Sequence, residues 1–186
     1  MKKLFFAAVA VFAFGITNAQ ETRFGAKGAL NFATITNSEG AKNKVGFAIG
    51  GFAEIGVSDK FKVQPELMYS IQGAKFEGGS FDLNYINIPV MGKFMVTEEI
   101  SLQAGPQIGI LMSATAKSDA GGSTDVKEFT KGIDFGLNFG AGYNIGEDMM
   151  IDLRYNLGLS QIEKELAPNQ TASKNAVIQL GFGYKF

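Results

Sequence analysis

Apolar and polar residues alternate along most of the chain in runs that are separated by turns or loops. The third run is the clearest, because its odd-numbered positions are apolar: Phe61, Val63, Pro65, Leu67, Tyr69 and Ile71. Its even-numbered positions are mostly polar: Lys62, Gln64, Glu66, Met68, Ser70 and Gln72. A helix, with its period of about 3.6 residues, would mix these two sets on every face. The alternation therefore predicts a β-strand.

Eight such runs follow one another, at 23–33, 45–57, 61–72, 83–96, 100–113, 131–145, 149–160 and 175–186. Three connections are tight (58–60, 97–99 and 146–148), and four are longer (34–44, 73–82, 114–130 and 161–174). Short and long connections alternate, as they do in outer-membrane barrels, where short turns face the periplasm and long loops face outward. The pattern predicts an all-β fold: an eight-stranded antiparallel up-and-down transmembrane β-barrel.

The two phases of the alternation differ in charge and in glycine content. Charged side chains are absent from the apolar phase through the body of each run, which is typified by Leu30, Phe47, Ile88, Leu153 and Ile178. The polar phase is rich in glycine, at positions 46, 50, 105, 109, 136, 140, 142, 158, 181 and 183. Glycine weakens a solvent-facing strand, but small residues suit the narrow interior of an eight-stranded barrel. We therefore expect the apolar phase to face lipid, and a soluble lipocalin-like barrel is the alternative.

Aromatic residues gather at the strand ends beside the tight turns: Phe24, Phe61, Phe94, Tyr143, Tyr184 and Phe186. Aromatic rings are enriched at the two membrane–water interfaces of barrels. This distribution favours the transmembrane interpretation over the lipocalin-like one.

The first residues have the composition of a secretory signal peptide. Lys2 and Lys3 form a positive start, residues 4–16 are apolar, and Ala19 offers a small residue for cleavage. We expect residues 1–19 to be a cleavable signal peptide and residues 20–186 to form the outer-membrane β-barrel domain.

Composition narrows the chemistry further. The chain has no cysteine and no histidine, which excludes disulfides, the usual zinc sites and histidine-based nucleophile systems. Removing Lys2 and Lys3 leaves 17 − 2 = 15 basic and 18 acidic residues, a net charge of 15 − 18 = −3. We therefore expect no catalytic residue, no cofactor, no metal site and no nucleic-acid partner.

Six charged residues of the polar phase are expected at similar depth inside the barrel: Lys27, Glu54, Glu66, Lys93, Asp152 and Arg154. Three cations and three anions indicate a network of ion pairs, because an unpaired buried charge is costly. Amides at 64, 87, 103, 107, 138, 156 and 179 would complete it. The network is interpreted as a structural plug of the lumen, and a gate or narrow ion path is the alternative.

Four segments together resemble the PorT-like outer-membrane β-barrel family, which groups with small barrels of the OmpX and OmpA type. They are NYINIPV at 84–90, AGPQIG at 104–109, DFGLNFGAG at 134–142 and LRYNLGL at 153–159. The resemblance covers essentially the whole chain after the signal peptide. It implies an eight-stranded barrel in the cell outer membrane, and it carries no activity over to this chain because most members have no assigned one.

The sequence therefore predicts a non-enzymatic, monomeric outer-membrane protein that lies among outer-membrane lipids. Its long connections (34–44, 73–82, 114–130 and 161–174) are expected to contact an extracellular ligand or to support envelope integrity, because exposed loops carry function on rigid scaffolds. Two alternatives remain: an accessory component of a transport or secretion system, and a lipid-modifying membrane enzyme. The lack of histidine disfavours the enzyme.

Overall fold

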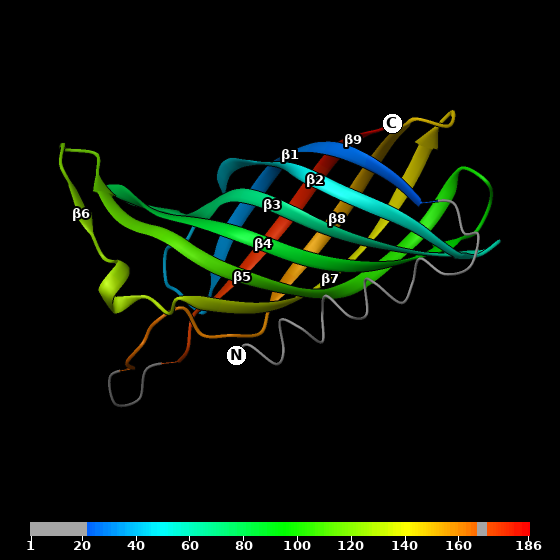
Figure 1. The fold of residues 1–186 in the computed structure, drawn as a ribbon. Helices are drawn as coiled ribbons and strands as arrows, with labels where there is room; N and C mark the ends of the chain where they lie inside the picture. Colours follow the sequence, from blue (N-terminus) through cyan, green and yellow to red (C-terminus); the bar gives the residue numbers. More distant parts are fainter. Residues whose placement is uncertain (1–21, 167–170) are drawn as a thin grey trace.

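The computed structural model describes residues 22–166 and 171–186 and forms one antiparallel sheet that closes on itself (Figure 1). The strands are β1 (Thr22–Thr36), β2 (Lys44–Ser58), β3 (Phe61–Phe76), β4 (Gly79–Met95), β5 (Ile100–Ser118), β6 (Ser123–Asp125), β7 (Ile133–Ile145), β8 (Met149–Gly158) and β9 (Lys174–Lys185). A single 3-10 turn, η1 (Lys127–Phe129), follows β6. The predicted signal peptide lies outside the described residues.

Closure of the sheet depends on two pairings between strands. β1 pairs with β9, so that Lys27 lies opposite Gly183, and β5 pairs with β7, so that Gln107 lies opposite Gly136. Each remaining neighbour in the barrel is the next strand along the chain, and all of these pairs are antiparallel. The predicted eight-stranded up-and-down barrel is therefore confirmed. β6 is an addition that pairs with β5 beyond the barrel wall.

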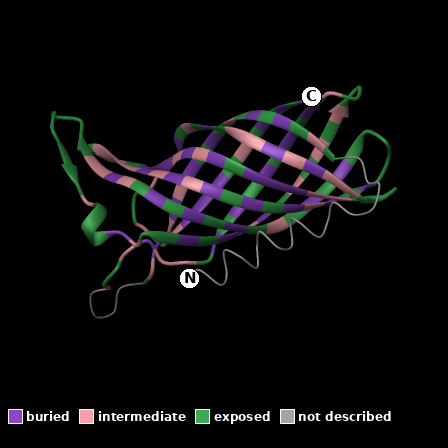
Figure 2. Ribbon diagram, in the orientation of Figure 1, coloured by how far each residue is buried: buried purple, intermediate pink, exposed green. Residues whose placement is uncertain are grey.

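The apolar phase faces outward. Leu30, Leu153 and Ile178 are 50%, 55% and 46% exposed, whereas Lys27 and Arg154 are each 2% exposed. Figure 2 shows this as exposed and buried bands that alternate along the strands of the barrel wall. A soluble barrel would bury the apolar side chains instead, so the lipocalin-like alternative is excluded. The six predicted interfacial aromatics are also exposed.

The barrel has two unlike ends. The "turn end" carries the tight connections 59–60, 96–99 and 146–148, and the "loop end" carries all the others. At the loop end β5 continues beside β6 as a ribbon that projects from the barrel wall (Figure 1). Among the described residues, no helix is long and apolar enough to cross a membrane.

Strand limits at the loop end correct the sequence prediction. β3 runs to Phe76 and β4 begins at Gly79, so the predicted loop 73–82 is a two-residue turn. Much of the predicted loop 114–130 is also ordered, because it contains the end of β5, β6 and η1. Strand pairing needs backbone hydrogen bonds but no apolar face. The strands therefore extend beyond the apolar pattern from which they were predicted.

Candidate functional site in the barrel interior

Glycines on the inner face leave room for long charged side chains. Gly181 lies on β9 between β1 and β8, and a Cβ atom added there would lie 2.6 Å from Lys27 Cε and 2.8 Å from Asp152 Oδ1. At Gly140 on β7, an added Cβ would lie 2.9 Å from Arg154 Cγ. Two glycines of the polar phase thus lie directly against the charges predicted for the lumen.

Four of the six predicted charges form a ring, which we call the charge ring: Lys27, Glu66, Asp152 and Arg154. Lys27 Nζ lies 2.7 Å from Asp152 Oδ2 and 3.7 Å from Glu66 Oε2. Arg154 closes the ring, with Nη1 at 2.7 Å from Glu66 Oε1 and Nε at 3.2 Å from Asp152 Oδ1. All four side chains are at most 2% exposed. The ring links β1, β3 and β8 across the lumen.

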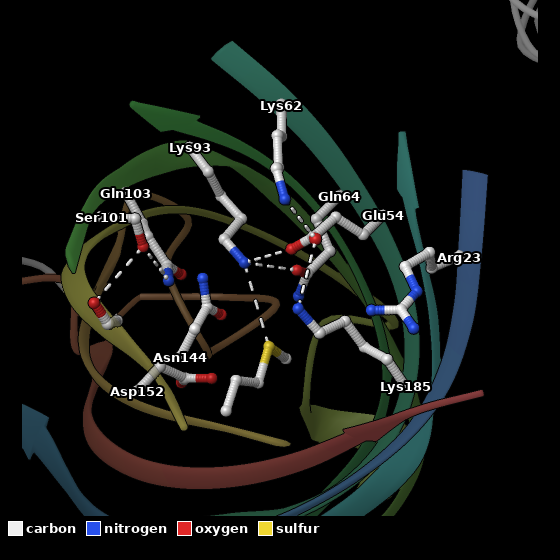
Figure 3. Close-up of polar contacts among 12 residues, drawn as sticks. Arg23, Glu54, Lys62, Gln64, Lys93, Ser101, Gln103, Asn144, Asp152 and Lys185 are labelled. Carbon is white, nitrogen blue, oxygen red and sulfur yellow. Dashed lines mark hydrogen bonds and ion pairs between the residues drawn. The ribbon is translucent and has the colours of Figure 1, made fainter. Parts of the chain in front are cut away.

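The other two predicted charges, Glu54 and Lys93, belong to a second group nearer the turn ends of β2 and β4. Figure 3 shows Lys93 pointing toward Glu54. Lys93 Nζ donates to Glu54 Oε2 at 2.6 Å. Two residues outside the six predicted charges complete this Glu54 cluster: Lys62, with Nζ at 2.8 Å, and Lys185, with Nζ at 3.5 Å from Glu54 Oε1. Both lie in the inward phase of their strands, close to the turn end. Phase together with distance from the turn could have identified them.

One amide joins the two groups. Gln64 Oε1 accepts a hydrogen bond from Lys93 at 3.0 Å, while Gln64 Nε2 donates to Glu66 Oε1 at 2.7 Å. Arg154 Nε also donates to Gln103 Oε1 at 3.0 Å. The six predicted charges are thus brought together in one network, although at two depths and not at one.

Amide side chains fill the next layer toward the loop end. Asn156 donates to Asn138 at 3.1 Å, and Asn138 donates to Gln107 at 3.2 Å. On the other wall, Gln179 donates to Asn31 at 2.9 Å. A cavity of about 20 Å³ remains among these residues, lined also by Asn87. Such a volume holds about one water molecule.

Apolar side chains occupy the interior at the loop end, where the sequence predicted a polar lumen. This apolar plug consists of Ile35, Ala74, Leu83, Tyr85, Leu111, Ala114 and Ile162, each at most 6% exposed. Ile35 continues the inward phase of β1, and Leu83 and Tyr85 continue the inward phase of β4. A register shift between β4 and β5 at Asn84/Tyr85 brings both Leu111 and Ala114 to the inner face. At the loop end the inward phase is therefore largely apolar, although the polar residues Lys44, Asp134 and Asn175 are buried there as well.

The interior thus has three layers of side chains: charges, amides and the apolar plug. The charge ring contains two cations and two anions, so it is neutral. Among the described residues, no group of three or more His, Cys, Asp or Glu side chains is placed to hold a metal ion. The chemistry of the site is mutual neutralisation of charges that come from separate strands.

Comparison with known proteins agrees with this architecture. Residues 18–164 match the family model described as the outer membrane protein beta-barrel domain. The chain belongs to this family. Family membership places the protein in the outer membrane, with the exposed apolar belt in contact with lipid. No curated protein matches the chain significantly.

Solved structures of this outer-membrane class share the fold. Neisserial surface protein A aligns with a TM-score of 0.56 and 16% identity, covering 91% of this chain and 100% of that protein. The attachment invasion locus protein Ail of Yersinia pestis aligns with a TM-score of 0.51 and 19% identity, over 90% and 99% of the two chains. At these identities the likeness concerns the barrel alone.

Proposed function

We propose that the protein is a non-enzymatic outer-membrane barrel with a sealed lumen, which holds its loop-end segments at the cell surface. The observation that carries this proposal is the filling of the middle of the barrel by side chains, between a cavity of about 500 Å³ at the turn end and one of about 230 Å³ at the loop end. The charge ring, the amide layer and the apolar plug follow one another along the barrel axis, with about 20 Å³ free in the amide layer.

The charge ring supports a structural role over a gate. Opening an ion path would require Lys27 and Arg154 to separate from Glu66 and Asp152, all of which are buried. Separating a buried pair leaves charges uncompensated, at a cost of roughly 3–5 kcal/mol. The ring is therefore stable only when closed.

Conductance of the purified protein in planar lipid bilayers tests the seal. We expect no steady current, whereas a porin inserted in the same bilayer under the same salt gives a large one. The variant Leu83→Ser/Leu111→Ser, which replaces two members of the apolar plug, should leave the conductance unchanged because the charge ring still closes the lumen. A steady porin-sized current through the wild-type protein would contradict the proposal.

The loop end is the proposed recognition surface. The described parts of the segments 34–44, 73–82, 114–130 and 161–174 carry exposed lysines, among them Lys42, Lys75 and Lys127, on a rigid barrel rim. Binding of intact cells to candidate extracellular ligands, compared with cells whose protein carries Lys42→Gln, Lys75→Gln and Lys127→Gln, measures this role. Equal binding by both strains would contradict it.

An accessory role in transport or secretion is the second candidate, and no motif in the chain carries that role over from PorT-like proteins. It predicts a periplasmic or membrane partner that co-purifies in fixed ratio, in place of the expected monomer. Lipid modification is disfavoured because the chain lacks histidine, the commonest general base. Turnover of labelled phospholipid or lipopolysaccharide by the reconstituted protein would revive it.

A further inference from the structure

The Glu54 cluster is unbalanced in charge. Three ammonium groups share one carboxylate, with Lys62 and Lys93 at 2.8 and 2.6 Å from Glu54 oxygens and Lys185 at 3.5 Å. The charge ring cannot supply the missing anions, because its two carboxylates already face two cations of their own. With all three lysines protonated, the Glu54 cluster carries a net charge of +2.

This excess charge borders an open space. A cavity of about 500 Å³ lies at the turn end, and its lining includes Glu54, Lys62 and Lys185. We call it the vestibule. Lys62 is 29% exposed, whereas Lys185 and Lys93 are 4% and 1% exposed. Figure 3 shows Lys62 and Lys185 approaching Glu54 from different sides. The volume of the vestibule falls within the range of small-molecule sites.

Arg23, the other cation that lines the vestibule, already has hydrogen-bond partners. Arg23 donates to Asp148 Oδ1 at 2.9 Å and to the Glu147 carbonyl at 2.7 Å. The acids Glu98, Glu99 and Glu147 line the outer part of the vestibule and are exposed. Salt largely screens exposed charges from partners more than about 10 Å away, whereas buried charges are screened much less. An anionic group is therefore favoured at the vestibule floor and disfavoured at its rim.

We propose that the vestibule is a binding site for a ligand that bears a single carboxylate, held at the floor by Lys62 and Lys185 beside Glu54. The carboxylate accepts charge-assisted hydrogen bonds from the two ammonium groups and lowers the excess charge. The acidic rim disfavours ligands of high negative charge, and the rest of the ligand occupies the outer vestibule. The site faces the turn end, so its ligand comes from the side opposite the recognition surface.

The test uses the full protein in lipid nanodiscs and two matched probes, acetyl-Ala-Ala with a free carboxylate and its carboxamide. Free acetate, as a third probe, distinguishes a simple ion site from one that also contacts the peptide. We expect saturable NMR shifts at the amides of residues 54, 62 and 185 with the carboxylate peptide and none with the carboxamide. Acetate should give the same shifts with weaker affinity.

Variants assign the site to the cluster. Lys62→Gln should weaken binding of the carboxylate peptide by about tenfold or more, the loss typical of one hydrogen bond between charged groups. Lys60→Gln is the matched control, because Lys60 is an exposed residue of the neighbouring turn that does not line the vestibule. It should retain the affinity. Glu98→Gln, at the exposed rim, should strengthen binding.

Two results would overturn the proposal. The first is an absence of saturable shifts with the carboxylate peptide in the wild-type protein, which would mean that the cluster sheds its excess charge without a ligand. The second is an equal loss for Lys62→Gln and Lys60→Gln, which would reduce binding to the general charge of this end. Heat-modifiability on gels must show that both variants form a folded barrel. Lys62→Arg, which keeps the positive charge, should retain binding.

Discussion

Lys27 on β1 and Asp152 on β8 meet over Gly181 of the strand between them, with Lys27 Nζ 2.7 Å from Asp152 Oδ2. The two residues are on strands that do not pair with each other. Their contact depends on the missing side chain at position 181, because an added Cβ would lie within 3 Å of both. A glycine thus sets the geometry of a buried ion pair.

Gly181→Ala should therefore destabilise the barrel. The added methyl group displaces Lys27 and Asp152, and overpacking of this kind costs roughly 1–3 kcal/mol. The control is Gly28→Ala on β1, whose added Cβ meets no atom within 4 Å. That change should stabilise the strand by about 0.5–1 kcal/mol. Urea unfolding of both variants in the same lipid measures the free energies, and equal effects would contradict this account.

Removing one charge from the charge ring should be far more damaging than removing an exposed one. Asp152→Asn leaves Lys27 and Arg154 to share Glu66, and breaking a buried pair costs roughly 3–5 kcal/mol. Asp148→Asn breaks the partly exposed pair with Arg23, which is worth about 0–1 kcal/mol. Equilibrium unfolding of the two variants compares the losses directly. A loss for Asp152→Asn no larger than for Asp148→Asn would argue against the ring.

The lipid-facing surface should tolerate charge according to depth. Leu153 lies in the middle of the exposed run of β8, and Leu159 lies just beyond its loop end. Leu153→Arg should cost about 2–4 kcal/mol and Leu159→Arg about 0–1 kcal/mol, because the penalty falls toward the interface. Unfolding free energies in lipid vesicles check the difference. Similar penalties at the two positions would mean that the belt is placed wrongly.

The apolar plug should stabilise the loop end as a local unit. Leu83 is fully buried, and Leu83→Ala leaves a cavity that costs roughly 2–5 kcal/mol. Hydrogen exchange should rise in the loop-end parts of β3, β4 and β5 and stay low around the charge ring. The exposed Met112→Ala serves as control and should leave exchange unchanged. Faster exchange throughout the barrel would show that the plug and the ring are not separate layers.

Most of the interior site could be predicted from phase and position. Lys27, Glu66 and Arg154 lie in the inward phase of the alternation. Because an unpaired buried charge is costly, ion pairs among them could be expected. Their pairing could not be predicted, because it depends on which strands face each other across the lumen. Lys62 and Lys185 were missed for a related reason: each lies near a strand end, where phase alone does not tell an inward side chain from one that reaches solvent.

By itself, the sequence determined the number of barrel strands, their antiparallel order and the face that meets lipid. The side chains that face lipid must be apolar, and every second side chain of a membrane-spanning strand faces lipid. Each strand of the barrel therefore shows an apolar residue at every second position. The tertiary structure alone decided the length of the strands beyond the belt, the apolar plug and the partners of each buried charge. Those features depend on backbone pairing and on contacts across the lumen, which join residues far apart in the chain and leave no local pattern.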